Sequence, residues 1–371
     1  MSRTEIGIGL VGSGFMGRCH ANAFRSVAGL FDVPEVPRLH MIADATPELA
    51  ERAAAALGFA HATGDWSELV ADPGVEIVAI TAPNVLHAPI AFAAIAAGKT
   101  IYCEKPLSTT ARTALEMTEA AEAAGIVTLV GFNFLRNPMI RLARDMIAGG
   151  EIGEVTGFRG RHAENYMADP DQPHSFRTDP AGGGALADIG SHILSMARYL
   201  LGPMTEVLGD CRTLYPTRPT APGHETRAPV EVDDMTHALV RFESGVSGSI
   251  EANWAATGRT MDLSWEITGT KGALAFSQEN MNELLFFSDT VAGRGFTRVE
   301  AGPRHAPYGN FCPAPGHHLG FNDLKVIEVA QLLDAHATGR PATPDFREAW
   351  EVQKTVEAIQ SSSVARGWVR V

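Results

Sequence analysis

The stretch "EIGIGLVGSGFMG", residues 5–17, decides the fold of the first third of the chain. A short apolar run ends in a Gly-x-Gly-x-x-Gly turn, and "RCHANAFRSV" behind it continues as a helix. This order is typical of a dinucleotide-binding unit: Gly12 permits the tight turn, Gly14 lets a pyrophosphate approach the backbone, and Gly17 lets the helix lie close to the strand. The helix N-terminus then offers its unpaired N–H groups to the phosphates.

A second buried strand, "RLHMIAD", ends at Asp44. A carboxylate at this point accepts hydrogen bonds from the hydroxyls of the adenosine ribose. It repels a 2′-phosphate, and "DATPE" offers no Arg or Lys to bind one, so NAD is favoured over NADP. The interval from Gly17 to Asp44 exceeds the usual value of about 20 residues, and the loop-like "GLFDVPEVP" accounts for the excess.

Strands and helices continue to alternate through "VEIVAITAP", "HAPIAFAAIAAG", "TIYCEKP" and "IVTLVGFNF". This alternation predicts an α/β domain with a doubly wound parallel sheet over residues 1–131. Ligands of such sheets bind outside the carboxyl ends of the strands. We therefore expect residues 12–17, 81–84 and 104–106 to lie on one edge of the sheet.

The pattern changes over residues 132–371, where we expect a second, α+β domain. Turns such as "ESG" and "GTKG" separate several strands and predict antiparallel hairpins. The proline-rich segment 215–232 is interpreted as a loop or arm, and the two C-terminal helices are candidates to pack back on the first domain. An apolar sheet face carrying Trp254 and Trp265 would be covered by another subunit, so a homodimer or homotetramer is expected.

One helix of the second domain, expected from about Ala185 to Leu201, carries Asp188 and His192. Residues four apart share a helix face, so these two side chains are expected to point the same way. The pair fits proton transfer, since imidazole titrates near neutral pH. An ordinary structural pair, an N-terminal Asp bonded to a half-buried His, is the alternative.

The composition limits the kinds of partner. The 371 residues include 30 basic and 43 acidic side chains, a formal charge of −13, which disfavours nucleic acid and anionic membranes. No run reaches the roughly 18 apolar residues of a spanning helix. The four cysteines are far apart in the sequence, so we expect neither a disulfide framework nor a metal site, and a cytoplasmic location.

Five motifs occur in an order that resembles the Gfo/Idh/MocA oxidoreductases: "GLVGSGFMG" with His20 behind it, "TAPNVLH", "CEKPLS", "GALADIGSH" and "GTKGALAF". The resemblance covers nearly the whole chain. It implies an N-terminal Rossmann domain and a C-terminal α+β domain with a large open, mainly antiparallel sheet. It also implies oxidation or reduction of a hydroxyl carbon of sugars, cyclitols and related compounds with a bound nicotinamide cofactor.

The resemblance assigns the catalytic roles to Lys105, Asp188 and His192. His192 takes the hydroxyl proton while Lys105 stabilises the developing charge on oxygen, or Lys105 itself is the base; the sequence leaves both open. Asp188 holds the imidazole tautomer or tunes the lysine. The resemblance also implies a cis peptide bond between Lys105 and Pro106.

The binding residues form two groups. The cofactor-binding group, from the glycine motif and the resemblance, comprises Gly12, Gly14, Phe15, Met16, Gly17, Asp44, Thr81, Ala82, Pro83, Asn84, His87, Glu104 and Lys105. The substrate-binding group, from the polar segment "RHAENYMADPDQPHSFRTDP" and the helix behind it, comprises His162, Asn165, Tyr166, Arg177 and His192. An ordinary polar loop is the alternative for the second group.

The expected function is that of an NAD-dependent dehydrogenase that oxidises a ring hydroxyl of a sugar, sugar derivative or inositol to the ketone or lactone. Two alternatives stay open: an NAD-dependent glycosidase of the same superfamily, and a non-catalytic dinucleotide-binding sugar sensor. Accumulation of NADH distinguishes the dehydrogenase from the glycosidase. A sensor would be expected to lack the catalytic residues, and Lys105, Asp188 and His192 are all present.

Overall fold

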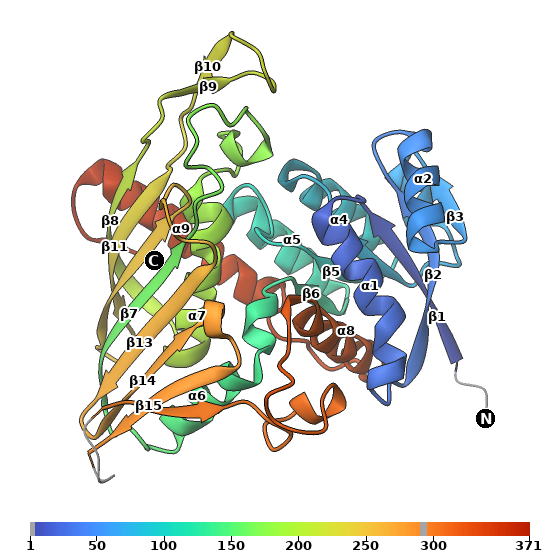
Figure 1. Ribbon diagram of the computed structural model, residues 1–371. Helices are drawn as coiled ribbons and strands as arrows, with labels where there is room; N and C mark the ends of the chain where they lie inside the picture. The colour runs from blue at the N-terminus through green and yellow to red at the C-terminus, as the bar shows by residue number, and fades with distance from the viewer. Residues whose placement is uncertain (1–3, 290–294) are drawn as a thin grey trace. The chain divides into compact units, whose positions relative to one another are not determined.

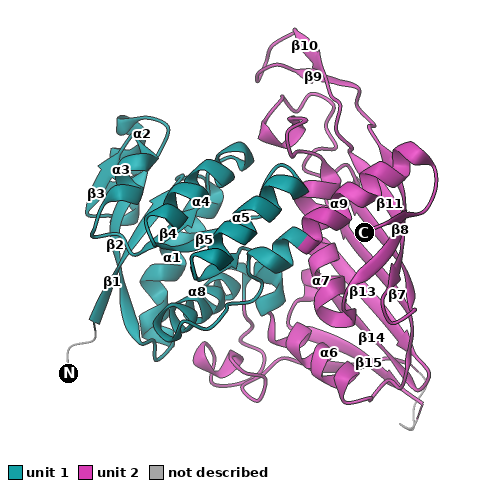
Figure 2. Cartoon of the chain, turned by 180° about the vertical axis from the view of Figure 1, so that it is seen from behind, with its two compact units in different colours: residues 1–136, 320–350 teal, residues 137–319, 351–371 magenta. Residues whose placement is uncertain are grey.

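The computed structural model describes residues 4–289 and 295–371, which fall into two units (Figure 2). Unit 1 comprises residues 1–136 and 320–350, and unit 2 comprises residues 137–319 and 351–371. The boundary predicted at residue 131 therefore lies inside unit 1, and the range predicted for the second domain includes a segment, 320–350, that belongs to unit 1. That segment returns because helix α8 (Phe321–Thr338) packs on α1 (Phe15–Leu30).

Unit 1 is built on a six-stranded sheet with the strand order β3-β2-β1-β4-β5-β6 (Figure 1). The strands are β1 (Thr4–Val11), β2 (Glu35–Ala43), β3 (His61–Thr63), β4 (Ile77–Ile80), β5 (Thr100–Cys103) and β6 (Thr128–Val130). All neighbouring pairs are parallel. β4 and β5 are buried along their whole length, as expected for the centre of a sheet covered on both faces. This is the predicted Rossmann topology, and the strand order reverses between β1 and β4.

The helices of unit 1 begin and end at residues that favour helix termini. Besides α1 and α8 they are α2 (Pro47–Leu57), α3 (Trp66–Ala71), α4 (His87–Ala96), α5 (Ala111–Ala123) and the first residues of α9 (Phe346–Ala365), with 3₁₀ turns η1 (Asn84–Leu86) and η2 (Asn133–Arg136). At the start of α2 the Thr46 side chain accepts a hydrogen bond from the Leu49 N–H, and Gly58 ends the helix with φ +78°.

Unit 2 contains a nine-stranded sheet with the order β16-β15-β14-β13-β7-β12-β11-β8-β17. Its strands are β7 (Val155–Ala163), β8 (Met204–Arg212), β11 (Met235–Phe242), β12 (Ser247–Asn253), β13 (Asp262–Gly269), β14 (Gly272–Ser277), β15 (Glu283–Ser288), β16 (Thr297–Glu300) and β17 (Val369–Arg370). The pair β7–β12 is parallel and the other pairs are antiparallel. The prediction of a mainly antiparallel sheet is confirmed.

One face of this sheet is covered by helix α7 (Ser191–Leu201), which packs on β7, β12 and β13. Unit 2 also contains α6 (Pro138–Ala148), most of α9, the 3₁₀ turns η3 (Phe176–Thr178), η5 (Gln278–Asn280) and η6 (Tyr308–Asn310), and the π-helical turn η4 (Leu186–Gly190). In β11, Thr236, Ala238 and Val240 are buried, and the residues between them are exposed. This alternation is the period of a sheet with one covered face.

Trp254 does not lie on an open face of the sheet, contrary to the sequence-based expectation. It is fully buried, and its indole N–H donates a hydrogen bond to Asp234. Trp265 is also buried, with its ring stacked on Phe276 at 5.9 Å between centroids. The sequence shows that Trp254 is apolar, but its burial depends on packing and on the hydrogen bond to Asp234.

The proline-rich segment forms an arm, as predicted. Strands β9 (Thr217–Pro219) and β10 (Arg227–Pro229) pair as a short antiparallel ribbon that extends beyond the nine-stranded sheet (Figure 1). We use "the arm" for residues 213–232. Among the residues that the structure describes, no helix combines the length and apolar character needed to cross a membrane.

Candidate active site

The carboxyl edge of the six-stranded sheet brings the predicted cofactor-side segments together. Residues 12–17 follow β1, Asp44 follows β2, residues 81–84 follow β4, and residues 104–106 follow β5. Because all the strands are parallel, these four segments leave the sheet at the same edge. This is the edge at which doubly wound sheets bind their ligands.

The three glycines of the motif are needed for different reasons. Gly12 has φ +96°, and a Cβ at Gly17 would stand 2.1 Å from the Gly12 carbonyl oxygen, so the fold itself requires both glycines. A Cβ at Gly14 would meet no atom of the described chain within 4 Å. The space beside Gly14 is therefore open, which fits a pyrophosphate lying against this turn. Phe15, 63% exposed, and the half-buried Met16 belong to the same turn.

Asp44 is tied to the glycine turn. Its Oδ2 accepts hydrogen bonds from the Ser13 N–H, at 2.9 Å, and from the Ser13 hydroxyl, and its Oδ1 accepts one from the Ala45 N–H at 2.7 Å. A carboxylate offers about four acceptor positions. The half-buried carboxylate thus keeps acceptor capacity for a ribose hydroxyl while three bonds fix its orientation.

The segment after β4 is joined to its neighbours by Thr81 and His87. The Thr81 hydroxyl donates to the Gly12 carbonyl at 2.8 Å. The buried His87 ring lies 2.9 Å from the Ala82 carbonyl through Nε2 and 2.8 Å from the Pro106 carbonyl through Nδ1. Burial lowers the pKa of His87, so the neutral ring donates to one of these two carbonyls.

These contacts place His87 between the segment after β4, which includes Pro83 and Asn84, and the segment after β5. Asn84 begins the turn η1, and its N-cap is Pro83. His87 was predicted to bind the cofactor. Its buried ring and its two backbone contacts indicate that it fixes two loops of the cofactor edge against each other.

Glu104 enters a buried ionic network behind the cofactor edge. Its Oε1 accepts hydrogen bonds from Lys325 Nζ at 2.7 Å and from His20 Nε2 at 2.8 Å, while its Oε2 lies 3.3 Å from the Lys105 N–H. Burial by itself would raise the pKa of Glu104, but the Lys325 ammonium outweighs it and holds that pKa well below its usual range. Glu104 is therefore ionised, with its charge compensated inside the protein.

The lysine in this network, Lys325 on α8, was not identified from the sequence. It is fully buried and also donates to Glu328 at 3.0 Å and to the Tyr102 hydroxyl at 3.1 Å. The Tyr102 hydroxyl in turn donates to Glu328. The signal in the sequence was a lysine and a glutamate three residues apart among apolar residues in "FNDLKVIEVAQLL", where charges have no place unless they are paired.

Lys105 follows Glu104 and is half-buried. The peptide bond between Lys105 and Pro106 is cis, which confirms that prediction. The Pro106 carbonyl contacts His87, and the Lys105 N–H contacts Glu104. The backbone on both sides of the Lys105 side chain is thus held by buried groups, which limits the positions that its ammonium can take.

In unit 2 the predicted helix differs from the expectation at its start. Residues 186–190 form a π-helical turn, and the α-helix α7 begins only at Ser191. Asp188 lies in the π-turn and His192 in α7, so the regular four-residue spacing that predicted a shared face does not hold across them. Single π-turns of this kind are frequent at functional sites.

Asp188 is the centre of a polar cluster. Its Oδ2 accepts hydrogen bonds from the Tyr166 hydroxyl at 2.9 Å and from Arg177 Nε at 3.0 Å. Burial and the Asp188 charge raise the pKa of Tyr166 well above its usual value, so Tyr166 stays protonated and donates. The Arg177 guanidinium lies over the rings of Tyr166, at 5.5 Å, and Phe176, at 4.6 Å.

Two histidines lie beside this cluster. The His162 ring is buried between the Ile189 carbonyl, 2.8 Å from Nδ1, and the Glu164 carboxylate, 2.8 Å from Nε2. Its centroid stands 5.7 Å from that of the His192 ring. Unit 2 therefore brings Tyr166, Arg177 and Asp188 together and places His162 against His192. Asn165, on the loop that follows β7, is exposed.

The start of the helix that carries His192 is held by Asp233, a residue that sequence reasoning missed. Its Oδ2 accepts hydrogen bonds from the Leu186 N–H at 2.9 Å and from the Thr236 hydroxyl at 2.8 Å. Burial raises the pKa of Asp233 to about 6. A buried aspartate before a strand gives no sequence signal of its own, because its partner lies 47 positions away.

Comparison with known proteins agrees with this geometry. Residues 6–132 match the oxidoreductase family with an NAD-binding Rossmann fold, and residues 140–275 match the GFO/IDH/MocA C-terminal domain. Levoglucosan dehydrogenase of Pseudarthrobacter phenanthrenivorans is 39% identical over 99% of this chain and 98% of its own. A levoglucosan dehydrogenase structure in complex with NADH and levoglucosan superposes with a TM-score of 0.95 at 39% identity, covering 99% of both chains. An NAD binding oxidoreductase from Klebsiella pneumoniae gives 0.93 at 42% identity, also over 99% of both chains.

The chain belongs to the Gfo/Idh/MocA family of oxidoreductases. It is an NAD-dependent dehydrogenase that acts on CH–OH groups. The predictions of family, fold class, cofactor and enzyme class are confirmed.

Proposed function

We propose that this enzyme oxidises a ring hydroxyl of a sugar or anhydrosugar, with levoglucosan as the first candidate substrate. The observation that carries this proposal is the likeness to levoglucosan dehydrogenase, which extends over 99% of this chain at 39% identity. The match extends over unit 2, which carries the substrate-side candidates, as well as over the cofactor domain. Inositols and other cyclitols present similar ring hydroxyls and are the next candidates.

The cofactor side of the reaction is assigned to unit 1. The backbone of residues 12–17 would receive the pyrophosphate, and Asp44 the adenosine ribose. The residues around Thr81, Asn84 and Lys105 would lie toward the nicotinamide end. When bound, NAD supplies the acceptor for the hydride that leaves the hydroxyl-bearing carbon.

Two residues are proposed to handle the hydroxyl proton. His192 takes the proton as general base, and the Lys105 ammonium donates a hydrogen bond to the same oxygen and stabilises its developing charge. Lys105 as the base is the alternative. Asp188 is proposed to hold the tautomer of the His192 imidazole or to tune the lysine.

The substrate side is proposed to consist of Tyr166, Arg177, His162, Asn165 and His192. A polyhydroxylated ring presents many donors and acceptors, and one left unpaired in a closed site costs about 1–3 kcal/mol. The cluster around Asp188 supplies charged and neutral groups of both kinds. Phe176, 46% exposed beside Arg177, adds an apolar surface of the kind that packs against the C–H face of a sugar ring.

The catalytic assignment is tested with Lys105→Ala and His192→Ala. Removal of a general base or of a preorganised donor lowers kcat by about 10²–10⁴-fold. The pH dependence of kcat/KM then separates the two assignments, because the acidic limb, where the base becomes protonated, should persist in the variant that retains the base. Near-normal turnover in both variants would contradict the assignment.

The substrate is tested by following NADH at saturating NAD with levoglucosan, other anhydrosugars, aldoses and inositols. We expect the highest kcat/KM with an anhydrosugar. Release of sugar from a glycoside without NADH would instead indicate the NAD-dependent glycosidase. Tight binding of a sugar without any turnover would indicate the sensor.

We also propose that the enzyme is a homo-oligomer, a dimer or a tetramer, formed through the outer face of the nine-stranded sheet. This face is hollowed by a cavity of about 1130 Å³ whose lining includes Arg161, Leu239, Ser264 and Glu266. Leu239 is 48% exposed in a central strand, where a subunit would bury it. Light scattering should give a multiple of 39.5 kDa, and Leu239→Arg should lower that mass; a monomeric wild type would contradict the proposal.

A cytoplasmic location is proposed from the thiols. All four cysteines are free, and Cys19 and Cys103 are buried. Buried unpaired thiols are typical of proteins kept in a reducing compartment. Fractionation of the source cells with an antibody against the enzyme would test this, and recovery from a secreted fraction would contradict it.

A further inference from the structure

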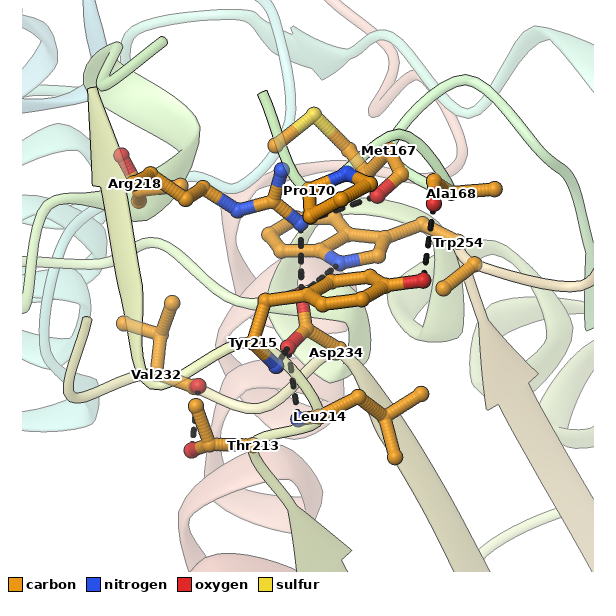
Figure 3. Close-up of polar contacts among 12 residues, drawn as sticks. Met167, Ala168, Pro170, Thr213, Leu214, Tyr215, Arg218, Val232, Asp234 and Trp254 are labelled. Atoms are coloured by element: carbon orange, nitrogen blue, oxygen red, sulfur yellow. Dashed lines mark hydrogen bonds and ion pairs between the residues drawn. The ribbon is translucent and has the colours of Figure 1, made fainter. Parts of the chain in front are cut away.

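The arm, residues 213–232, is joined to the loop that carries the substrate-side residues. We call residues 164–185 the site loop; it connects β7 to the π-turn that bears Asp188. Arg218 of the arm is fully buried, and its guanidinium donates to two carbonyls of the site loop, each at 2.9 Å. Nη2 donates to Met167 (Figure 3), and Nη1 donates to Asp169.

Two further arm residues complete a continuous row of contacts. The Tyr215 hydroxyl donates to the Ala168 carbonyl at 2.7 Å (Figure 3), and Arg227 Nη2 donates to the Pro170 carbonyl at 2.7 Å. Four consecutive carbonyls of the site loop, from 167 to 170, therefore accept hydrogen bonds from arm side chains. The arm supplies the partners that a strand or helix would otherwise provide.

The whole arrangement is centred on one buried carboxylate, Asp234. Its Oδ1 accepts from Arg218 at 3.2 Å and from the Trp254 indole at 2.7 Å, and its Oδ2 accepts from the Leu214 and Tyr215 N–H groups at 2.7 and 3.0 Å. A buried ion pair is tolerated when further hydrogen bonds satisfy its remaining atoms. Here the further bonds come from the Leu214 and Tyr215 N–H groups at the base of the arm and from the Trp254 indole. Asp234 therefore joins the arm to Trp254.

From this centre two connections reach Tyr166. The first is the backbone, since Tyr166 directly precedes the row of bonded carbonyls. The second is Trp254, whose ring lies edge-on to the Tyr166 ring at 6.2 Å between centroids and whose carbonyl accepts the Met167 N–H at 3.0 Å. Tyr166 in turn donates its hydroxyl to Asp188. The position of this donor on the catalytic carboxylate thus depends on residues of the arm.

We propose that Tyr215 and Arg218 are positioning residues, which act through Tyr166 on Asp188 and so set the geometry of the substrate side. This inference rests on the proposed function for its catalytic readout. The cofactor residues belong to unit 1 and the arm to unit 2, so NADH binding should not depend on the arm. Loss of an arm contact moves the site loop and thereby weakens substrate use.

The most informative variant is Tyr215→Phe, because it removes only the hydroxyl that bonds Ala168 and keeps the ring. One lost hydrogen bond of this kind changes an equilibrium about fivefold. We expect kcat/KM for the sugar to fall about fivefold, mainly through KM, with an unchanged Kd for NADH. Amide exchange over residues 164–172 should become faster. Arg218→Lys, which keeps the charge but cannot reach both carbonyls, should do the same more strongly.

A double-mutant cycle distinguishes positioning from a general structural effect. If Tyr215 acts through Tyr166, the Tyr215→Phe change should have little further effect on kcat/KM in a Tyr166→Phe background. Additive losses in the cycle would overturn the proposal. The pH profile of kcat/KM supplies a second readout, because Tyr215→Phe should shift its limbs in the same direction as Tyr166→Phe.

Matched controls are available within unit 2. Tyr199→Phe removes the hydroxyl of a half-buried tyrosine stacked under Arg144, and Arg298→Met removes an exposed guanidinium paired with Glu283. Both should leave KM and loop exchange unchanged. A wild type that forms no NADH with any sugar would refute the proposed function alone, and the exchange experiment would then decide the inference: unchanged exchange in Tyr215→Phe and Arg218→Lys would overturn it.

Discussion

Two buried carboxylates, Glu104 in unit 1 and Asp233 in unit 2, each support a candidate catalytic residue, and they are stabilised in opposite ways. Glu104 precedes Lys105 and is bonded to the Lys325 ammonium, which depresses its pKa. Asp233 accepts hydrogen bonds from a backbone N–H and a hydroxyl, both neutral, and its pKa is raised to about 6. The first arrangement compensates a charge inside the protein, whereas the second makes a buried group sensitive to pH.

The two regions therefore differ in how they respond to the loss of a charge partner and to a change of pH. In unit 1 Glu104 is ionised at neutral pH. Removing the Lys325 ammonium would therefore leave a buried negative charge without compensation. In unit 2 ionisation of Asp233 is itself a cost that the fold bears at neutral pH. Variants of the two carboxylates and of their partners test this contrast.

Lys325→Met should have the largest effect. It removes the ammonium from between Glu104 and Glu328 and should lower the free energy of unfolding by about 3–5 kcal/mol. Denaturant unfolding at pH 7 measures this. In the control Lys354→Met, the ion pair with Glu351 is partly exposed, and about 0–1 kcal/mol is expected. Equal losses in the two variants would show that the buried network does not stabilise unit 1 through charge compensation.

The pH dependence of stability should have opposite signs for the two carboxylates. The depressed pKa of Glu104 stabilises the fold above its unfolded pKa, and this contribution is lost as the pH falls below that value. The raised pKa of Asp233 means that the folded state binds the proton more tightly than the unfolded state. Its contribution therefore falls as the pH rises from about 4 to about 6 and is constant above that.

Asp233→Asn tests the second half of this contrast, because the amide cannot ionise and its oxygen can accept the same bonds. The free energy of unfolding of the variant, relative to wild type, should increase by up to about 3 kcal/mol between pH 4 and pH 6. This follows because a tenfold difference in proton affinity between the folded and unfolded states corresponds to about 1.4 kcal/mol. Urea unfolding at several pH values measures this, with the exposed Asp210→Asn as control. A difference that does not change with pH would refute the raised pKa.

The smallest effects on stability distinguish two glycines, one beside each region. Gly184 has φ +104°, and a Cβ there would stand 2.3 Å from Asp233 Oδ1, so Gly184→Ala should cost about 1–3 kcal/mol. Gly14→Ala should change stability by less than about 0.5 kcal/mol and weaken NADH binding at least about tenfold, because its Cβ meets only the ligand. Fluorescence titration with NADH measures the second effect. Unchanged affinity in Gly14→Ala would argue against a pyrophosphate at this turn.

The cofactor edge was predictable because its chemistry is local in sequence. The glycine turn, Asp44 and the lysine after β5 each follow a strand with a clear apolar pattern, and the parallel sheet brings strand ends to one edge without further information. The cofactor-binding roles of His87 and Glu104 stay predictions. Both were predicted at the cofactor, and both have their polar atoms in buried contacts, which a single motif cannot reveal.

The substrate side was predictable only in part. The roles of Asp188, His192 and the polar segment before them stay predictions, and the structure gathers Tyr166 and Arg177 on Asp188. The π-turn at residues 186–190 was not foreseen, because it differs from an α-helix by one extra residue in a turn and has no composition of its own. The short strand β3 and helix α3 were likewise not predicted.

The sequence by itself determined the fold class, the cofactor edge and the family, because these depend on the period of apolar residues and on glycines within a few positions of each other. The partners of the buried groups that support Lys105 and His192 follow only from the folded structure. Lys325 meets Glu104 across 221 positions, and Asp233 holds the start of the helix that carries His192 across 47. Buried charges and hydrogen-bonding groups need partners wherever the chain brings them, and the choice of partner follows from packing in three dimensions.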